Sequence, residues 1–306
     1  MDKKKLWVVC PCFFDVDSFC KTELEARRAV MEKFPDFSLH FVLIDDSAGA
    51  DPKVADLKTR PDLSILHMPY NLGHQAAIVY ALRTLGNEVA ENDYLITMDA
   101  DGEDRPEDTP ALLNVLVKNE KNSLQIVLAW RTFRRETMVF KIGYFCFRNV
   151  FRLLTGKQIK NGNFAAFRGL FLKEIIFHPH FDQCYSSSFI SLPLQIDFVA
   201  LPRGVRFFGT TKMGYMNLIT HGLKMLMPLT ERIAIRGVVT SAFLAFLSLL
   251  CLLVLIRSSF VAAVFAFFAL FSMTLIAGLF ALLFATFSQS KATSLRRLRE
   301  ISLPNK

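Results

Sequence analysis

The most informative stretch of this chain is Tyr94-Leu95-Ile96-Thr97-Met98-Asp99-Ala100-Asp101-Gly102-Glu103-Asp104-Arg105-Pro106-Glu107. Its first five residues form an apolar run that predicts a buried strand. The acids that follow lie close together, so each raises the pKa of its neighbours. A divalent cation would relieve this repulsion, and carboxylate oxygens suit Mg²⁺ or Mn²⁺. The alternative is an acidic turn that caps the helix expected near Pro106, and the stretch alone does not separate the two.

Apolar runs and helical patterns alternate along the first part of the chain. Strands are expected at 6–10, 39–44, 63–67, 94–98 and 125–129, with helices at 19–34, 74–86 and 106–119. This alternation predicts a three-layer α/β domain built on a parallel sheet. Further along, we expect an aromatic-rich helix at 140–154 and a turn leading into a strand at 161–167.

Polar residues follow three of the expected strands directly. They lie at 11–15, at Asp45-Asp46 and between Asp99 and Asp101. In parallel sheets, ligands gather at the carboxyl ends of the strands. This shared location predicts one site at that edge of the sheet.

The C-terminal part of the chain is strongly apolar. The chain has 306 residues, of which 52% are hydrophobic, and the runs 237–256 and 258–290 contain no charged residue. Each run is long enough to cross a bilayer, which takes about 20 residues. We therefore expect a tight transmembrane hairpin, preceded by an amphipathic interfacial helix near 213–227. The alternative is a pair of buried core helices.

These patterns predict the domain organisation of the chain. A globular domain is expected over 1–212, an interfacial helix over 213–232, two transmembrane helices over 233–290 and a basic tail over 291–306. Basic residues flank both ends of the hairpin, whereas the turn between its helices offers Arg257 alone. The positive-inside rule then places the globular domain and both termini of this multi-pass protein on the cytoplasmic side of the inner (plasma) membrane.

The charge and cysteine content narrow the class of protein. The formal net charge of +8 suits a domain that lies against anionic lipid. Nucleic acid is not expected as a partner, because the basic residues concentrate near the membrane end. The start of the chain lacks the pattern of a signal peptide. The six cysteines show no metal-binding spacing, and a cytoplasmic domain would keep them reduced.

Several motifs occur along the chain in a recognisable order. They are Pro11-Cys12-Phe13-Phe14-Asp15, Ile44-Asp45-Asp46-Ser47, Asn71-Leu72-Gly73-His74-Gln75-Ala76-Ala77, the acidic stretch, Arg131-x-x-Arg134-x-Glu136, Asn163-Phe164 with Arg168, and Arg206-Phe207-Phe208-Gly209-Thr210-Thr211-Lys212. Together they resemble family 2 glycosyltransferases of the GT-A fold. The resemblance is to the branch that moves a sugar from a nucleotide to a polyprenyl phosphate, in which two C-terminal transmembrane helices also occur. That branch contains dolichol-phosphate mannosyltransferases and their bacterial glucosyl and aminoarabinosyl relatives.

The resemblance implies a membrane-bound transferase of cell-envelope glycan biosynthesis. Its reaction would be an inverting, metal-dependent transfer of a sugar from a nucleotide-sugar donor, UDP- or GDP-linked, to undecaprenyl or dolichyl phosphate. Mg²⁺ or Mn²⁺ would be the cofactor. The implied nucleotide-binding residues are Pro11, Asp15, Asp45, Asp46, Asn71, Gly73 and Asp99, and the implied metal ligands are Asp99, Asp101 and Glu103. The implied phosphate-binding residues are Arg131, Arg134, Arg206, Thr211 and Lys212, and the implied catalytic residues are Asp101, Arg131, Arg134, Arg206 and Lys212.

Elementary chemistry agrees with these roles. Charge develops on the leaving diphosphate, where a metal ion and fixed cations stabilise it. Guanidinium groups match phosphate oxygens in geometry. Five positions depart from the family pattern: Asp15 stands for Glu, Ser47 for Gly-Ser, Glu103 for Gln, Asn163 for Asp and Met213 for Tyr. These departures concern the identity of the substrate more than the class of reaction.

Other interpretations stay open at this stage. A hydroxyl acceptor would need a general base, for which Asp182 and Asp197 are the candidates, although neither lies in a recognised base motif. The departures also fit a non-catalytic membrane scaffold. His74 could contact a phosphate or cap a helix. Finally, Phe-rich helices can pack between copies, so a homo-oligomer is another open alternative.

Overall fold

The computed structural model describes residues 4–120, 122, 124–132, 138–209, 214–255 and 260–302. The chain divides into two compact units, one made of Met1–Lys141 with Ile159–Met225 and the other of Ile142–Gln158 with Leu226–Lys306. The first unit contains the sheet and the helices that cover it. The second contains the long C-terminal helices.

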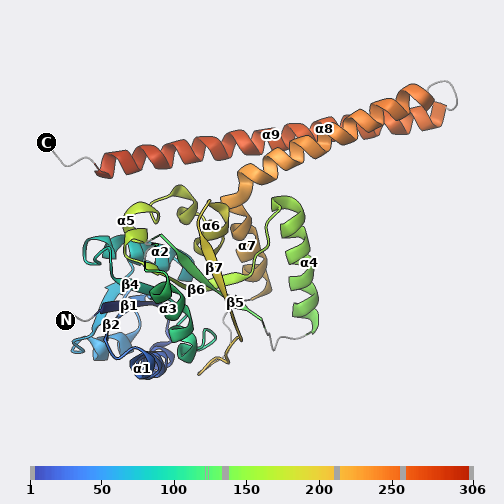
Figure 1. The fold of residues 1–306 in the computed structure, drawn as a ribbon. Helices are drawn as coiled ribbons and strands as arrows, with labels where there is room; N and C mark the ends of the chain where they lie inside the picture. The colour runs from blue at the N-terminus through green and yellow to red at the C-terminus, as the bar shows by residue number, and fades with distance from the viewer. Residues whose placement is uncertain are drawn as a thin grey trace. The chain divides into compact units, whose positions relative to one another are not determined.

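Seven strands form a single sheet in the first unit (Figure 1). They are β1 (Lys4–Cys12), β2 (Phe37–Asp45), β3 (Leu63–His67), β4 (Tyr94–Thr97), β5 (Ile126–Arg131), β6 (Asn161–Arg168) and β7 (Ile196–Leu201). Their order across the sheet is β3-β2-β1-β4-β6-β5-β7. The strands expected at 6–10, 39–44, 63–67, 94–98, 125–129 and 161–167 are therefore confirmed, with small shifts at their ends.

Helices cover both faces of this sheet. One face carries α1 (Val16–Lys33), the turn η1 (Pro52–Leu57), η3 (Pro106–Asp108) and α3 (Thr109–Lys118). The other carries α2 (His74–Thr84), η2 (Leu85–Asn87), α5 (Leu170–Glu174), η4 (Pro179–Asp182) and α6 (Tyr185–Ser191). In β1, Leu6 and Val8 join the first core, whereas Trp7 and Val9 join the second. Strands that are buried on both faces read as continuous apolar runs, and the expected three-layer α/β architecture is confirmed.

The expectation of a purely parallel sheet is wrong at one strand. β6 runs antiparallel to β4, with Thr97 opposite Ala165, and antiparallel to β5, with Trp130 opposite Asn161. β5 ends at the carboxyl edge of the sheet, and β6 begins beside that same end. The chain therefore re-enters the sheet from the site side and must run in the opposite direction.

β7 was not expected from the sequence, although it pairs in parallel with β5 along its whole length. It lies at the edge of the sheet, and most of its residues are partly exposed. Residues such as Asp197 and Ala200 have low strand propensity. Pairing with β5, rather than local preference, establishes this strand.

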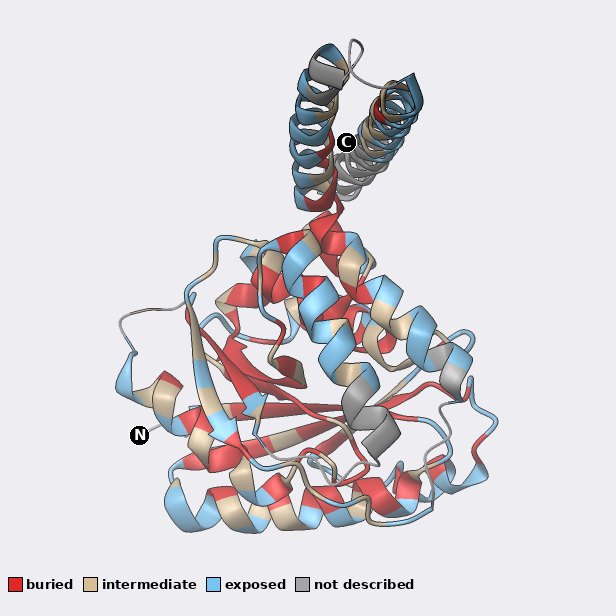
Figure 2. Cartoon of the chain, turned by 90° about the vertical axis from the view of Figure 1, so that its right-hand side faces the viewer, coloured by how far each residue is buried: buried red, intermediate tan, exposed pale blue. Residues whose placement is uncertain are grey.

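The second unit contains the two longest helices of the chain. They are α8 (Thr230–Leu255) and α9 (Phe260–Ser302), which pack against each other. Stretches at Leu218–Leu250 and Phe260–Leu283 are long and apolar enough to cross a membrane. In the coloured parts of these helices in Figure 2 exposed residues predominate, and Phe260 and Phe265 are 83% and 70% exposed. Large apolar side chains at this exposure are typical of a lipid-facing surface.

Three further elements complete the chain. They are α4 (Met138–Thr155), which was expected at 140–154, α7 (Tyr215–Leu226) and the turn η5 (Met227–Leu229). α7 falls within the stretch where we expected an interfacial helix, and it exposes Met216, Ile219 and Leu223. Its position at a membrane surface stays a prediction.

An aromatic cluster fixes α6 to the sheet. The ring of Phe189 is fully buried, and its centroid lies 4.9 Å from that of Tyr185, 5.4 Å from that of Phe181 and 5.7 Å from that of Phe171. Phe167 of β6 also faces this ring, at 6.4 Å. Phe189 therefore joins α6, η4, α5 and β6.

The Phe189→Ala variant should lower the free energy of unfolding by about 3 to 5 kcal/mol, because it leaves a cavity among rigid rings. Chemical denaturation of the full-length chain in detergent measures this change. The control is Leu24→Ala, whose side chain is 69% exposed on α1 and should matter by less than about 0.5 kcal/mol. Equal effects of the two substitutions would show that the cluster does not stabilise the fold.

Candidate functional site

The acid loop, residues 99–104, follows β4 at the carboxyl edge of the sheet. Two hydrogen bonds fold it into a tight turn: the main-chain N–H of Asp99 donates to the Asp104 carboxylate at 3.0 Å, and that of Glu103 donates to Asp101 at 2.9 Å. The amide of Asn163 in β6 donates to Asp99 at 2.9 Å. Four carboxylates are thereby held within one turn of chain.

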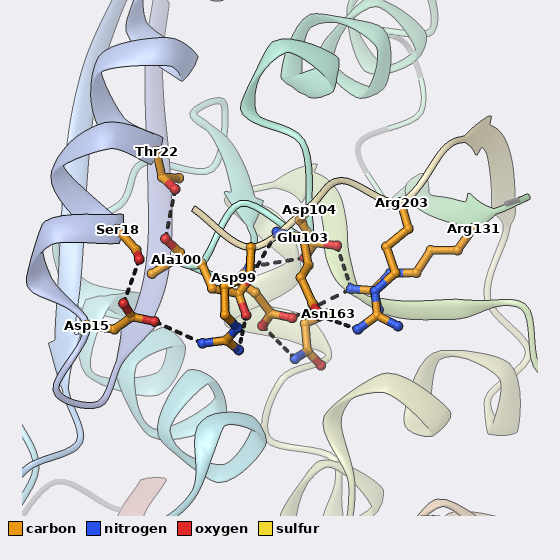
Figure 3. A network of polar contacts seen from close by, with 12 residues as sticks. Asp15, Ser18, Thr22, Asp99, Ala100, Glu103, Asp104, Arg131, Asn163 and Arg203 are labelled. Atoms are coloured by element: carbon orange, nitrogen blue, oxygen red, sulfur yellow. Dashed lines mark hydrogen bonds and ion pairs between the residues drawn. The ribbon is translucent and has the colours of Figure 1, made fainter. Parts of the chain in front are cut away.

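Three arginines contact the acid loop, two of which, Arg131 and Arg203, are labelled in Figure 3. Arg131, at the end of β5, lies 2.6 Å from Asp104 and 3.6 Å from Asp99. Arg203 pairs with Glu103. Arg206 lies 2.5 Å from Asp101 and 3.1 Å from Asp15.

Arg203 and Arg206 belong to residues 203–207, here called the basic strap. The main-chain N–H of Gly204 donates to the carbonyl of Glu103 at 2.9 Å, and that of Phe207 donates to the carbonyl of Asp101 at 2.8 Å. A Cβ atom at Gly204 would lie 2.1 Å from the carbonyl oxygen of Gly102. The strap therefore lies directly on the acid loop, and only glycine allows this approach.

The crowding of acids shifts their pKa values. Burial, together with the charges of Asp99 and Glu103, raises the pKa of Asp101 to about 7. Burial also raises the pKa of Asp104, against the effect of Arg131. In Asp99 burial acts in the same direction, but His74, Arg131 and Asn163 outweigh it and lower the pKa. At Asp101 the charge of Arg206 acts in the opposite direction but does not outweigh burial and the neighbouring acids.

Two neighbouring loops contain the other acids predicted to bind a nucleotide. Both oxygens of Asp45 accept hydrogen bonds, from Ser47 and from Gly49 and His67. Asp46 accepts from the main-chain N–H groups of Leu72 and Gly73, at 2.7 and 2.9 Å. These bonds join the end of β2 to the start of α2 and shape the edge of the site.

Two histidines lie beside these acids. The rings of His74, the first residue of α2, and His221 of α7 have centroids 5.7 Å apart. Gly73 is the residue that precedes the helix, so His74 itself is not the cap.

The acid loop has the donor chemistry of a divalent cation site. Among the described residues, no group of three His, Cys, Asp or Glu side chains is arranged to hold a metal ion. Asp99 and Asp101 nevertheless lie two residues apart, and the raised pKa of Asp101 marks a place that favours added positive charge. Hard carboxylate oxygens of this kind fit Mg²⁺ or Mn²⁺. The ligand role of Asp99, Asp101 and Glu103 stays a prediction.

The structure brings together several residues that the sequence had singled out. Asp15, Asp99, Asp101, Glu103, Arg131 and Arg206 lie in one network of contacts. Pro11, Asp45, Asp46, Asn71 and Gly73 lie at the adjoining strand end and loops. Arg134, Thr211 and Lys212 fall outside the described residues.

Sequence reasoning missed the roles of Arg203, Asp104 and His221. Glu103 adds a negative charge where the family pattern has a neutral residue, so a compensating cation could have been sought, and Arg203 is that cation. Asp104 was visible in the acidic stretch, but its bond to the Asp99 N–H was not. Nothing in the spacing of His221 marks it, because helix α7 brings it to the site.

A comparison with known families gives the identity of the domain. The sequence model described as glycosyl transferase family 2 matches residues 13–176, just over half of the chain. The chain belongs to glycosyl transferase family 2. None of the curated protein sequences matches this glycosyltransferase significantly.

The chain also resembles solved structures at low sequence identity. Glucosyl-3-phosphoglycerate synthase from Mycobacterium tuberculosis, solved with Mn²⁺, UDP and glucosyl-3-phosphoglycerate, is 14% identical, with a TM-score of 0.50 over 75% of this chain and 80% of its own. A mannosyltransferase from Pyrobaculum calidifontis, solved with GDP-Man and Mn²⁺, is 15% identical, with a TM-score of 0.44 over 99% of this chain and 81% of its own. At these identities the likeness to the synthase shows the fold, and the mannosyltransferase adds no argument.

The Arg131→Met variant of the glycosyltransferase should lose about 3 to 5 kcal/mol of stability, because it leaves the buried Asp104 without a countercharge. Adding Asp104→Asn should restore part of this loss. Denaturation of the two variants measures both effects. Lys173→Met, which breaks an exposed pair with Glu91, should change stability by less than about 1 kcal/mol. No recovery in the double variant would contradict the pairing.

Asp101 should make the stability of the glycosyltransferase depend on pH. Its folded pKa of about 7 lies above the unfolded value of about 3.9. At pH values between these two, the folded chain holds a proton that the unfolded chain has released. The stabilisation from this group is complete below about pH 4 and is lost as the pH rises through about 7.

Unfolding measured between about pH 5 and 8 should therefore show a flatter profile for Asp101→Asn than for the wild type, by on the order of 2 kcal/mol. Glu107→Gln, at an exposed carboxylate, is the control and should leave the slope unchanged. Parallel profiles for Asp101→Asn and wild type would show that the carboxyl titrates normally.

Proposed function

We propose that this glycosyltransferase transfers a sugar from a nucleotide-diphosphate donor to a polyprenyl phosphate, with inversion, at the cytoplasmic face of a membrane. The observation that carries the proposal is the acid loop with three arginines at the carboxyl edge of a family 2 domain. Such a site combines the groups that bind a metal ion with the groups that bind phosphates. The motifs resemble the polyprenyl-phosphate branch of the family.

The donor diphosphate would lie between the acid loop and the basic strap. Asp99 and Asp101 would hold Mg²⁺ or Mn²⁺, which neutralises charge on the leaving diphosphate when bound. A synthase of the same fold is solved with Mn²⁺ and UDP, which supports a donor of this class. Asp45, Asp46 and the loop at 71–73 would line the nucleotide pocket.

The arginines would stabilise the leaving group and the acceptor. Arg206 contacts Asp15 and Asp101 at once, so its guanidinium is already positioned at the acid loop. When the diphosphate binds, the guanidinium group of Arg206 can exchange its contact with a carboxylate for a contact with a phosphate, because the two anions have similar geometry. Preorganised cations of this kind lower the barrier without reorganising during the reaction.

A phosphate acceptor needs no general base, which fits the partners of the two candidate bases. An oxygen of the polyprenyl phosphate would bond to the anomeric carbon as the bond from that carbon to the nucleoside diphosphate breaks, and no proton has to move. Asp182 and Asp197, the candidate bases for a hydroxyl acceptor, have other partners: Arg83 lies 2.5 Å from Asp182, and Gln125 bonds Asp197. These contacts favour structural roles for both acids.

The C-terminal helices support a lipid-linked acceptor. Two stretches are long and apolar enough to cross a membrane, and α7, which leads into them, exposes Met216, Ile219 and Leu223. The excess of Lys and Arg on both flanks of the hairpin favours a cytoplasmic catalytic domain. Arg206 precedes this membrane end of the chain closely in sequence.

Incubation of the full-length protein with undecaprenyl phosphate and a panel of UDP- and GDP-sugars should yield one lipid-linked sugar, detected by chromatography. EDTA should abolish the product, and added Mn²⁺ or Mg²⁺ should restore it. Asp101→Asn and Arg206→Gln should each lower kcat by at least about 100-fold, because both act on the developing charge.

The same assay separates the alternatives. Asp182→Ala and Asp197→Ala should retain near-wild-type turnover, whereas a hydroxyl-acceptor enzyme would lose it in one of them. Calorimetry with UDP or GDP and Mn²⁺ should show metal-dependent binding, which a non-catalytic scaffold would lack. No EDTA-sensitive lipid product with any donor of the panel would overturn the proposed acceptor.

A further inference from the structure

Two asparagines at the start of β6 have side-chain amides whose orientation is fixed by their partners. The Nδ2 of Asn163 donates to the Asp99 carboxylate at 2.9 Å, and the Nδ2 of Asn161 donates to the main-chain carbonyl of Ser186 at 2.7 Å. A carboxylate and a carbonyl can only accept hydrogen bonds. The nitrogen of each amide must therefore face these groups, and the Oδ1 atom must face the other way.

Both Oδ1 atoms are buried and lack a hydrogen-bond partner in the described part of the chain. Asn161 and Asn163 are 7% and 4% exposed. Buried polar atoms normally have a hydrogen-bond partner, and a buried atom without one lowers the stability of the folded state. Two such acceptors in one short segment indicate that a ligand supplies the missing donors.

The position of these atoms points to the reaction site. Asn161 and Asn163 are two residues apart on a strand, so they lie on the same face of the sheet. They begin β6 at the carboxyl edge, where Thr97 donates to the main-chain carbonyl of Asn163 at 2.6 Å. Asn163 and Asp99 lie together in Figure 3.

A second row of side chains holds Asn161 in place. Gln75 of α2 donates to the hydroxyl of Ser186 at 3.0 Å, and the thiol of Cys184 donates to the Oε1 of Gln75 at 2.9 Å. The Ser186 carbonyl in turn receives the Asn161 amide. The orientation of Asn161 is thus supported from α2 and α6, as a selective contact requires.

We propose that Asn161 and Asn163 recognise hydroxyl groups of the donor sugar and thereby determine which sugar is transferred. This inference rests on the proposed function, because it takes the ligand beside the acid loop to be a nucleotide sugar. Sugar hydroxyls donate the hydrogen bonds that both Oδ1 atoms can accept. The donor class is therefore a neutral, hydroxylated sugar.

The same atoms disfavour an acidic sugar. Both Oδ1 atoms can only accept hydrogen bonds. A uronate carboxylate in this position would face these oxygen atoms, and it could donate no hydrogen bond to them. A uronate keeps the ring hydroxyls of the neutral sugar and carries a carboxylate in place of the C6 hydroxymethyl group, so acceptors that meet this end of the sugar discriminate against it.

Calorimetry on the full-length protein with Mn²⁺ tests the inference by comparing sugar nucleotides with the bare nucleotides. The probes are UDP-glucose, UDP-glucuronate and GDP-mannose beside UDP and GDP. Asn161→Leu and Asn163→Leu should each weaken binding of the preferred neutral sugar nucleotide at least about tenfold. Asn161→Leu, which leaves the bond between Asn163 and Asp99 intact, should leave UDP or GDP binding unchanged. Asn87→Leu, at an exposed position of η2, is the matched control and should change neither.

The possible outcomes distinguish a failure of this inference from a failure of the proposed function. Wild-type protein should bind UDP-glucuronate at least about tenfold more weakly than UDP-glucose. This comparison uses the wild-type protein alone, so it does not depend on the folding of any variant. Equal binding of these two sugars overturns the selection against acidic sugars, and unchanged sugar-nucleotide binding in both folded Asn→Leu variants overturns the inference alone. Wild-type protein that binds neither UDP nor GDP overturns the proposed function and the inference with it.

Discussion

The structure of this domain depends on one electrostatic constraint: four carboxylates lie in a single turn after β4 and need positive charge close by. Arg131 arrives from β5, and Arg203 and Arg206 arrive from the basic strap, more than a hundred residues beyond the start of the acid loop. Like charges at this spacing repel strongly when water is excluded. The ends of β4, β5 and the strap must therefore meet, and the sheet order β4-β6-β5 brings the two strand ends to the same edge. The fold and the site satisfy the same requirement.

Local patterns were enough to predict most of the sheet and its helices. Continuous apolar runs such as Leu6–Cys10 and Tyr94–Met98 are buried on both faces, and periodicity separates them clearly from the amphipathic helices. The direction of β6 was not predictable, because direction depends on where the chain re-enters the sheet, and no residue of Asn161–Arg168 encodes that. β7 depends on its pairing with β5 in the same way. Tertiary contacts, not propensities, establish these two strands.

The residues of the site could be predicted from the sequence, but most of their contacts could not. Chain order and motif resemblance selected acids and arginines that the fold brings together, since Asp15, Asp101 and Arg206 meet from three separate segments. The detailed partners were not predictable. Spacing cannot show that Asp104 accepts the Asp99 N–H, that Asp46 binds the loop before α2, or that His221 reaches His74. The first contact depends on how the acid loop turns, and the other two join segments that are distant in the sequence. The role proposed for the asparagines of β6 likewise follows only from the structure, because their hydrogen-bond partners fix the direction of their amides.

Where the basic strap lies on the acid loop, main-chain contacts position the backbone and the side chains provide the charged groups of the site. Main-chain hydrogen bonds from Gly204 and Phe207, with the close approach of Gly204 to Gly102, hold the backbone of the strap beside the acid loop, in addition to the ion pairs of Arg203 and Arg206. Arg203 and Arg206 therefore project from a backbone that makes its own contacts with the loop. During evolution, such a segment can accept new side chains toward new substrates one substitution at a time. The glycines at the crossing are the positions that cannot vary.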